Sequence, residues 1–312
     1  MITILLTIDV DADFFDSSIS SDAISFEKSW KGLELGIPRL IELFNGYKGS
    51  DSSDCKATWF VRADNQIKHH FGTHSYLLDN YRDLWEGLYK NNHEIAWHPH
   101  LYNSRDWTQE TDPDLLALQM RQSYTAVTKA LGRRLTTSRI GEAFFTNEIA
   151  NVLLDLGIKV DSTALPGRAR NDGERSFDWT KTPEMPYFLS ETDYSVPGTP
   201  ALPLLEFPFS MIPVMAEYDA IPLKRYLDLS FWHHTVCNGL ENMMGENTVL
   251  NTIIHPSTAL PELSNGKRHG LLSFNIGEVR RNLDFIIDIA QKRSIPYQFK
   301  TISEASIIYL NG

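Results

Sequence analysis

The sequence alternates short apolar runs with segments of helical periodicity, and this alternation constrains the fold more than any other feature. Residues 2–10 are β-branched and apolar, as in a strand buried on both faces of a parallel sheet. Further strands are predicted at 57–61, 93–100, 138–141 (short, ending in a turn), 158–162, 202–208, 248–254 and 295–301, and helices at 36–45, 77–89, 113–131, 147–156, 224–244, 276–294 and 303–309. Repeated strand–helix units predict an α/β fold with a parallel sheet. At 312 residues we expect one domain, 1–312, and a TIM-like barrel rather than an open sheet.

Two carboxylates, Asp9 and Asp11, stand at the carboxyl end of the first predicted strand. Side chains alternate along a strand, so both carboxylates should point the same way. Ligands bind at this end of the strands in α/β folds. Because two like charges repel, we expect a metal ion or an arginine to compensate them. The alternative is that they solvate a loop or cap a helix, with Asp13 continuing the polar run into a loop rich in serine and aspartate at 16–21.

Polar residues also lie at the ends of other predicted strands. His98 and His100 fall on one face of the strand at 93–100, while Arg139 and His255 follow later strands. One carboxylate and two imidazoles form a common zinc or iron set of hydrolytic enzymes that leaves coordination positions open. A lone histidine such as His255 is more often structural, so the combination carries the prediction.

Composition excludes several other classes. The formal net charge is −11 without a basic stripe, which argues against a nucleic-acid partner. Two distant cysteines make neither a disulfide scaffold nor a cysteine zinc site. The apolar start is too short for a signal peptide, and no run is long enough to cross a membrane, so we expect a cytoplasmic protein.

A long segment, residues 165–200, is polar and dense in proline, glycine and aromatic residues. A loop of this length in a compact domain is usually a lid or a binding loop. Its candidate substrate contacts are Arg168, Arg170, Asp178, Trp179, Tyr187 and Tyr194. Ordinary packing of a long loop is the alternative for its aromatic residues.

Four motifs in order, residues 7–11, 93–100, 139–141 and 253–256, resemble those of the polysaccharide deacetylase family, the metal-dependent N-deacetylases of the carbohydrate esterase 4 type. The resemblance implies a distorted (β/α)7 barrel. It also implies one divalent metal, usually zinc, held by an aspartate and two histidines.

Carried over to this sequence, the resemblance implies Asp9 as catalytic base and Asp11 and His98 as metal ligands. It further implies Arg139 as the residue that orients the base and His255 as general acid. Glu206 falls, more loosely, where the family has a pocket-forming strand.

Two positions depart from the family pattern. Val10 separates the two aspartates, which are usually adjacent, so which acid is the base stays open. The usual second histidine lies four residues after the first, and that position is Tyr102. His100 is the nearest substitute, so the second imidazole ligand also stays open.

We therefore expect a hydrolase that removes an N-acyl group, in the first instance acetyl, from an amino sugar or saccharide precursor. The expected metal is Zn²⁺. One alternative is a non-sugar amide hydrolase or a sugar deformylase of the same fold. Another is a carbohydrate-binding relic without catalysis.

Overall fold

The computed structural model describes residues 1–13, 30–173, 175–263 and 270–310. Its internal contacts divide the chain into two compact units, both discontinuous in sequence. The first unit comprises residues 1–57 and 210–301, and the second comprises residues 58–209 and 302–312. Asp9 and Asp11 of the opening segment therefore belong to the first unit, and His98 and His100 belong to the second.

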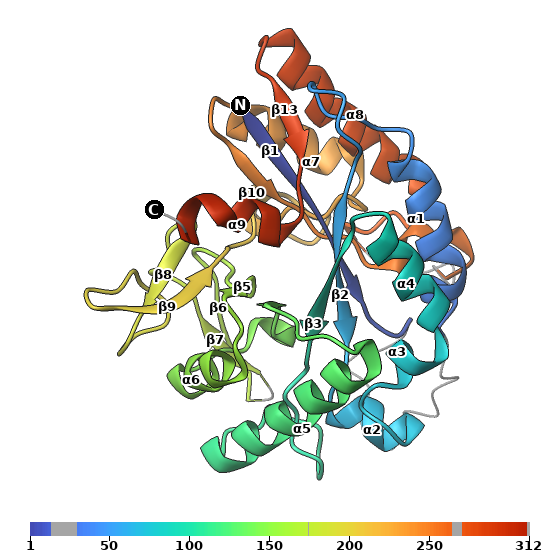
Figure 1. Cartoon of the computed structure of the whole chain (residues 1–312). Coiled ribbons are helices and arrows are strands. Elements are labelled where there is room, and N and C mark those ends of the chain that lie inside the picture. The colour runs from blue at the N-terminus through green and yellow to red at the C-terminus, as the bar shows by residue number, and fades with distance from the viewer. Residues whose placement is uncertain (14–29, 174, 264–269, 311–312) are drawn as a thin grey trace. The chain divides into compact units, whose positions relative to one another are not determined.

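The first unit is built on strand β1 (Ile2–Val10), which pairs in parallel with β12 (Val249–Asn251) and β13 (Tyr297–Phe299). Figure 1 shows β13 alongside β1. Its other elements are η2 (Gly32–Gly36), α1 (Ile37–Phe44), β10 (Met211–Val214), β11 (Leu223–Tyr226), α7 (His233–Met243), η4 (Pro256–Ala259), η5 (Pro261–Leu263) and α8 (Ile276–Lys292).

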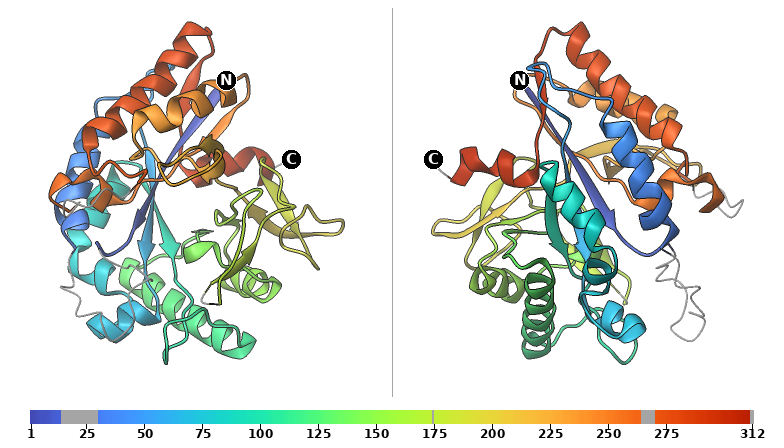
Figure 2. Two further views of the ribbon diagram at one scale, coloured as in Figure 1. Left: turned by 180° about the vertical axis from the view of Figure 1, so that it is seen from behind. Right: turned by 45° about the vertical axis from the view of Figure 1, so that its right-hand side comes forward.

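Strand β1 is buried on both faces. Ile4, Leu6 and Ile8 on one face and Leu5 and Thr7 on the other are fully buried, as expected for a largely apolar strand inside a parallel sheet. Helix α8 buries the stripe that its periodicity predicts, Val279, Leu283, Ile286 and Ala290. Helices α7 and α8 lie side by side, as both views of Figure 2 show.

Two glycines let η2 and α1 pack closely against η4. A Cβ atom on Gly36 would lie 2.3 Å from the carbonyl oxygen of Pro256, and one on Gly32 would lie 2.7 Å from the backbone nitrogen of Ser257. Asp13 caps the start of η2 by accepting hydrogen bonds from Lys31 N and Gly32 N, each 2.8 Å long. Close backbone approach of this kind requires glycine. This close packing holds Pro256 and Ser257, the two residues that follow His255, against η2 and α1.

The second unit contains a sheet in the order β2–β3–β4–β5–β9–β8, in which the first five strands are parallel and β8 is antiparallel. Its strands are β2 (Ala57–Arg62), β3 (Glu94–His98), β4 (Thr137–Ser138), β5 (Val160–Asp161), β8 (Tyr187–Ser190), β9 (Ala201–Glu206) and a separate hairpin of β6 (Ala169–Asn171) and β7 (Ser176–Asp178). Its helices are α2 (Asn65–Phe71), α3 (Tyr76–Asn80), α4 (Arg82–Lys90), α5 (Pro113–Leu131), η3 (Gly141–Ala143), α6 (Asn147–Leu156) and α9 (Ile302–Leu310).

Helices α5 and α6 have the bounds that their sequence signals predict. The Asp112 carboxylate caps α5 by accepting from Asp114 N and Leu115 N, and Gly132 ends the helix with a φ of 66°. Thr146 caps α6 in the same way, and Gly157 ends it with a φ of 85°. These are the ordinary start and stop residues of helices.

Several predicted elements differ from the structure. The expected lid, 165–200, contains β6, β7 and β8 rather than being a structureless loop. The helix predicted at 77–89 is split at Tyr81 into α3 and α4, and the segment 224–244 begins as β11 before α7. Helix α2 was not predicted, and the polar loop predicted at 16–21 lies outside the described residues.

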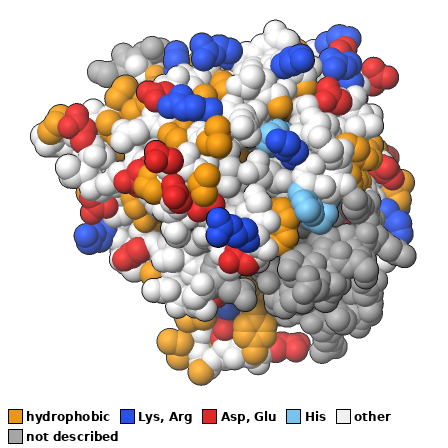
Figure 3. All heavy atoms as spheres, turned by 90° about the horizontal axis from the view of Figure 1, so that it is seen from below, with side chains coloured by type: hydrophobic (Ala, Val, Ile, Leu, Met, Phe, Trp, Pro, Cys, Tyr) orange, Lys and Arg blue, Asp and Glu red, His pale blue; other side chains and the backbone are white. Residues whose placement is uncertain are grey.

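The predicted α/β class with parallel strands is confirmed. Among the helices in the described part of the chain, none is both long and apolar enough to cross a bilayer. Acidic and basic side chains are interspersed on the face drawn in Figure 3.

Candidate functional site

In the first unit, the expected base and acid lie at the end of β1. The backbone of β1 continues its pairing beyond β12 through the bridge between Ile8 and Ile254, and Asp9 N donates to the carbonyl of Ile254 at 3.1 Å. His255 follows at once in the chain, so parallel pairing brings Asp9 and His255 to the same strand end. Asp9 is 5% exposed.

The imidazole of His255 lies between two carboxylates. Its Nε2 is 3.8 Å from Oδ2 of Asp11, and its Nδ1 is 4.0 Å from Oδ2 of Asp228. Asp228 is fully buried, and its Oδ1 accepts from Ser230 N at 2.8 Å and from Ser230 Oγ at 2.6 Å. Burial raises the pKa of Asp228, and the neighbouring His255 opposes that rise. Asp228 is therefore placed to hold the Nδ1 side of His255.

Asp228 is a site residue that our sequence analysis missed. It lies between β11 and α7, in a segment that was predicted to be helical, and it forms a parallel bridge with Ile253. Leu227, Asp228, Leu229 and Ser230 alternate apolar and polar residues, which is the pattern of a strand. That alternation was the signal available in the sequence.

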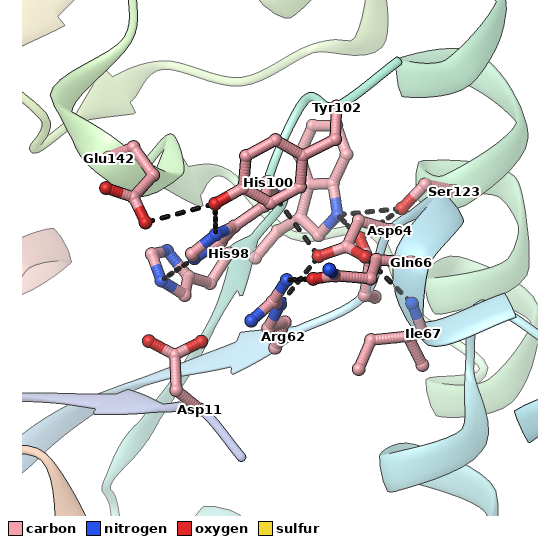
Figure 4. A network of polar contacts seen from close by, with 12 residues as sticks. Asp11, Arg62, Asp64, Gln66, Ile67, His98, His100, Tyr102, Ser123 and Glu142 are labelled. Atoms are coloured by element: carbon pink, nitrogen blue, oxygen red, sulfur yellow. Dashed lines mark hydrogen bonds and ion pairs between the residues drawn. The ribbon is translucent and has the colours of Figure 1, made fainter. Parts of the chain in front are cut away.

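In the second unit, His98 and His100 converge at the end of β3 (Figure 4). Their Nε2 atoms are 3.2 Å apart, and both side chains are buried. The Nδ1 of His98 is 2.7 Å from the carbonyl oxygen of Arg139. A carbonyl only accepts, so Nδ1 of His98 carries a proton and the Nε2 of the neutral ring presents a lone pair.

This pair fits a divalent metal. Two nitrogen ligands at zinc distances of about 2.0–2.1 Å in a tetrahedral set lie roughly 3.3 Å apart. The Nε2 separation of 3.2 Å matches that spacing without rearrangement. Imidazole nitrogens are ligands that zinc and iron accept. The expectation that His100 replaces the usual second histidine therefore has a geometric basis within this unit.

Asp64 fixes the backbone that carries His100, as Figure 4 shows. Its Oδ2 accepts from His100 N at 3.1 Å, and its Oδ1 accepts from Ile67 N at 2.9 Å, which caps α2. Arg62 pairs with the same carboxylate through Nε at 2.7 Å, and neither side chain is exposed by more than 1%. The sequence places Arg62 and Asp64 at the carboxyl end of the strand predicted at 57–61, but that position did not indicate this role.

Arg139 is buried in a polar and aromatic cage. Its Nε donates to the carbonyl of Ser162 at 2.8 Å, and Nη2 donates to Ser162 Oγ at 3.0 Å. The guanidinium carbon lies 4.0 Å from the ring centre of Phe60 and 4.1 Å from that of Phe209. Aromatic faces and fixed acceptors hold the cation in one orientation.

Glu206 is fully buried beside Asp161, its register partner on β5. Glu206 Oε1 accepts from Ala164 N at 2.8 Å, and Asp161 Oδ2 accepts from Ser138 Oγ at 2.6 Å. Burial raises the pKa of Asp161 to about 6, and burial together with the Asp161 charge raises the pKa of Glu206 well above its usual value. In this conformation the Glu206 carboxylate lies inside the unit, where it is not open to a substrate.

The other predicted substrate contacts, six residues in all, lie on the segment 165–200. Arg168 is half-buried at the start of the β6–β7 hairpin, and Tyr187 is 6% exposed and donates from its hydroxyl to the carbonyl of Tyr194 at 3.0 Å. Trp179 is fully buried, and its Nε1 donates to the carbonyl of Ala143 at 2.9 Å. Trp179 thus anchors the segment by packing.

Comparison with known proteins gives a family-model match over part of the chain and a similar fold. Residues 41–160 match the model of the polysaccharide deacetylase family. No curated protein matches the sequence.

Three solved structures resemble the fold of this chain. A structure named as a polysaccharide deacetylase from Mycobacterium smegmatis is 15% identical, with a TM-score of 0.54, and the match covers 98% of this chain and 88% of the other. PuuE allantoinase is 12% identical with a TM-score of 0.54, over 97% of this chain and 88% of the other. A structure from Pseudomonas aeruginosa PAO1, also named as a polysaccharide deacetylase, is 12% identical with a TM-score of 0.53, over 97% and 89%. The likeness confirms the expected fold class, the α/β fold of the distorted (β/α)7 barrel type.

Proposed function

We propose that the protein is a metal-dependent hydrolase that removes an N-acetyl group from an amino sugar or saccharide precursor. The proposal starts from the match of residues 41–160 to the model of the polysaccharide deacetylase family. The observation that carries the proposal is the convergence of the His98 and His100 Nε2 atoms at 3.2 Å. Two buried imidazoles at the spacing of metal ligands are unusual outside a metal site.

In this proposal Asp11 is the third ligand of the cation, for which Zn²⁺ is the first choice. Asp11 directly follows β1, and its carboxylate lies 3.8 Å from the His255 ring within its own unit. One aspartate and two histidines leave coordination positions open for water and substrate. When bound, the cation supplies the Lewis acidity that polarises the scissile carbonyl and activates water at neutral pH.

Asp9 is the general base in this scheme. It takes a proton from the water that attacks the amide carbonyl. Arg139 is the proposed positioning residue for that base, and its guanidinium is held in one orientation by Ser162 and Phe60. A positioned base of this kind contributes about 10²–10⁴-fold to the rate.

His255 is the general acid that completes the reaction. Its Nε2 proton passes to the amine nitrogen as the carbon–nitrogen bond breaks, which releases the carboxylic acid and the free amine. Asp228 faces Nδ1 of the same ring at 4.0 Å, so its carboxylate is placed to orient the imidazole. Arg168 and Tyr187 remain proposed substrate contacts. Glu206 is proposed to shape the pocket wall from inside, because its carboxylate is buried.

A second candidate function is hydrolysis of a non-sugar amide. It is favoured by the likeness of the fold to PuuE allantoinase, which has the same TM-score as the first deacetylase structure. Removal of a formyl group from a sugar would use the same residues. A carbohydrate-binding relic remains the non-catalytic alternative.

One experiment separates these functions. Metal-free protein is titrated with Zn²⁺, and the loaded protein is assayed for acetate and formate release from N-acetylated sugars, N-formylated sugars and small non-sugar amides. We expect one zinc per chain and acetate from an amino sugar. His98→Gln should abolish both zinc binding and acetate release. His234→Gln, at an exposed histidine on α7, should change neither zinc binding nor acetate release. Zinc binding without release of any acid would support the relic, and absence of zinc binding would overturn the proposal.

A further inference from the structure

Tyr102 occupies the position at which the family's usual spacing places the second histidine, yet it lies against His100. Its hydroxyl oxygen is 3.2 Å from Nδ1 of His100, and the side chain is 7% exposed. An antiparallel bridge to Gln109 holds its backbone. Tyr102 therefore contacts the side of the His100 ring opposite to the nitrogen that faces His98 (Figure 4).

The proton of the Tyr102 hydroxyl is committed to another residue. Tyr102 donates to Glu142 Oε1 at 3.0 Å, and Glu142 Oε2 lies 2.7 Å from Nη1 of Arg175. The Arg175 and Glu142 side chains are only 11% and 21% exposed, so the Glu142 carboxylate is held in a partly buried ion pair. An ionised carboxylate only accepts hydrogen bonds, and a phenol has one proton to give.

This count of protons fixes the tautomer of His100. Because Tyr102 donates to Glu142, its oxygen can only accept from His100, and the Nδ1 of His100 must carry the proton. The Nε2 of the neutral ring is then left with its lone pair, as in His98. The two Nε2 atoms, 3.2 Å apart, then both present lone pairs and have no proton between them for a hydrogen bond. This arrangement suits a cation bound by both nitrogens.

The backbone around Glu142 is built for this contact. Glu142 and Ala143 have φ values of 60° and 54°, which non-glycine residues rarely adopt. A Cβ atom on Gly141 would lie 2.1 Å from the His100 ring, so the turn passes directly against that ring. Strand β7 directly follows Arg175, and its first residue, Ser176, donates from its backbone nitrogen to Gln109 Oε1. Because Gln109 is also the bridge partner of Tyr102, this hydrogen bond links the Arg175 segment to the Tyr102 segment. A strained turn that delivers one carboxylate to one phenol indicates a function for that contact.

We propose that the hydrogen-bonded series Arg175, Glu142 and Tyr102 holds His100 in the tautomer that presents Nε2 to the metal, so that Tyr102 and Glu142 are positioning residues of this site. The proposal rests on the proposed function for the presence of the metal. Residues that hold a histidine ligand through its other nitrogen typically change metal affinity by about 10–100-fold when removed. In this chain the tyrosine thereby supports a metal histidine rather than replacing it.

The test measures tautomer and metal affinity separately from activity. Long-range proton–nitrogen NMR spectra of the metal-free protein report which ring nitrogen of His100 is protonated, with the signals assigned by their loss in His100→Gln. Zinc affinity is measured by competition with a chelator. The variants are Tyr102→Phe, which keeps the ring and removes only the oxygen, and Glu142→Gln, which keeps an acceptor but loses the ion pair.

We expect the Nδ1-protonated tautomer in the unmodified protein, a mixed population in Tyr102→Phe, and a fall in zinc affinity of about 10–100-fold. The zinc affinity of Glu142→Gln should fall less than that of Tyr102→Phe. The matched control is Tyr124→Phe, because Tyr124 is also buried and donates to a backbone carbonyl, that of Leu135, at 2.6 Å. The control should leave both readouts unchanged.

Three outcomes would overturn the proposal. One is a His100 tautomer that is unchanged in Tyr102→Phe, and another is an affinity within twofold of the unmodified protein. The third is complete loss of zinc with the tautomer preserved, which would make Tyr102 a ligand itself. By contrast, the proposed function is overturned if the unmodified protein binds no zinc. If the protein binds zinc and the variants show both the tautomer change and the fall in zinc affinity, but no hydrolysis is found, the positioning role is supported and only the proposed function fails.

Discussion

The Nδ1 of His255 faces Oδ2 of the fully buried Asp228 at 4.0 Å, while Nε2 on the other side of the ring is 3.8 Å from Asp11. The oxygen of Asp228 that faces the ring has no hydrogen bond from the described residues. A buried carboxylate in that position stabilises a positive charge on the imidazole. His255 therefore has one nitrogen facing buried Asp228 and the other facing Asp11, which directly follows β1.

Asp228→Asn should lower kcat by about 10²-fold or more while zinc content stays unchanged, because the substitution removes the charge that supports His255 as an acid. Turnover at saturating zinc and metal content by elemental analysis measure the two effects. Asp219→Asn is the matched control, since Asp219 pairs with Arg225 at 2.7 Å in the same unit. Equal losses in both variants would show that Asp228 acts on stability only.

Asp11→Ala should lose zinc, whereas His255→Ala should keep zinc and greatly slow turnover. The first change removes a proposed ligand, and the second removes the proton donor to the leaving amine. Metal stoichiometry and kcat distinguish the two. Asp13→Asn serves as control, because Asp13 accepts from Lys31 N and Gly32 N through its two different oxygens, and asparagine keeps one of these two cap hydrogen bonds while removing the charge. Full zinc occupancy in Asp11→Ala would exclude Asp11 from the ligand set.

The buried pair of Asp161 and Glu206 should make stability depend on pH. Burial raises the pKa of Asp161 to about 6, and the pKa of Glu206 is raised well above its usual value. The folded protein thus binds these protons more tightly than the unfolded chain. The resulting stabilisation is complete below about pH 4 and is lost as the pH rises through about 6 and beyond.

Glu206→Gln removes one of these titrations, so its melting temperature should gain on that of the unmodified protein between about pH 5 and about pH 8. Thermal melts of the metal-free proteins give this comparison. Glu191→Gln, at an exposed position, should follow the unmodified protein throughout. Parallel curves for Glu206→Gln and the unmodified protein would show that the pair does not share a proton.

Local signals predicted the parts of the fold that depend on local physics. The bounds of α6 were predicted because a threonine cap, an apolar stripe and a terminal glycine all lie within its own sequence. The three-residue strands β6 and β7 were not, because segments so short carry no periodicity. Their segment is anchored by a distant contact, from Trp179 to the carbonyl of Ala143.

The same distinction applies to the candidate site. His98 and His100 were predicted because alternation along one strand places them together. Asp228 was missed because its strand-like backbone depends on hydrogen bonds with Ile253, which is distant in sequence. The contact between Tyr102 and Glu142 joins residues 40 positions apart, so no spacing rule predicts it.

Gly36→Ala should destabilise the protein and slow turnover together. Its Cβ would lie 2.3 Å from the carbonyl oxygen of Pro256, and backbone atoms at that distance must move apart. Overpacking of this kind costs about 1–3 kcal/mol. Because Pro256 directly follows His255, the movement should also displace the proposed acid, so kcat should fall at temperatures where the variant is fully folded.

Gly87→Ala separates this effect from that of adding a methyl group to any helix. Gly87 lies inside α4, and a Cβ there would have nothing within 4 Å. That variant should gain about 0.5–1 kcal/mol from the higher helix propensity of alanine and keep its turnover. If Gly36→Ala unfolds earlier but keeps full kcat while folded, the packing of η2 and α1 on η4 supports the fold without positioning His255.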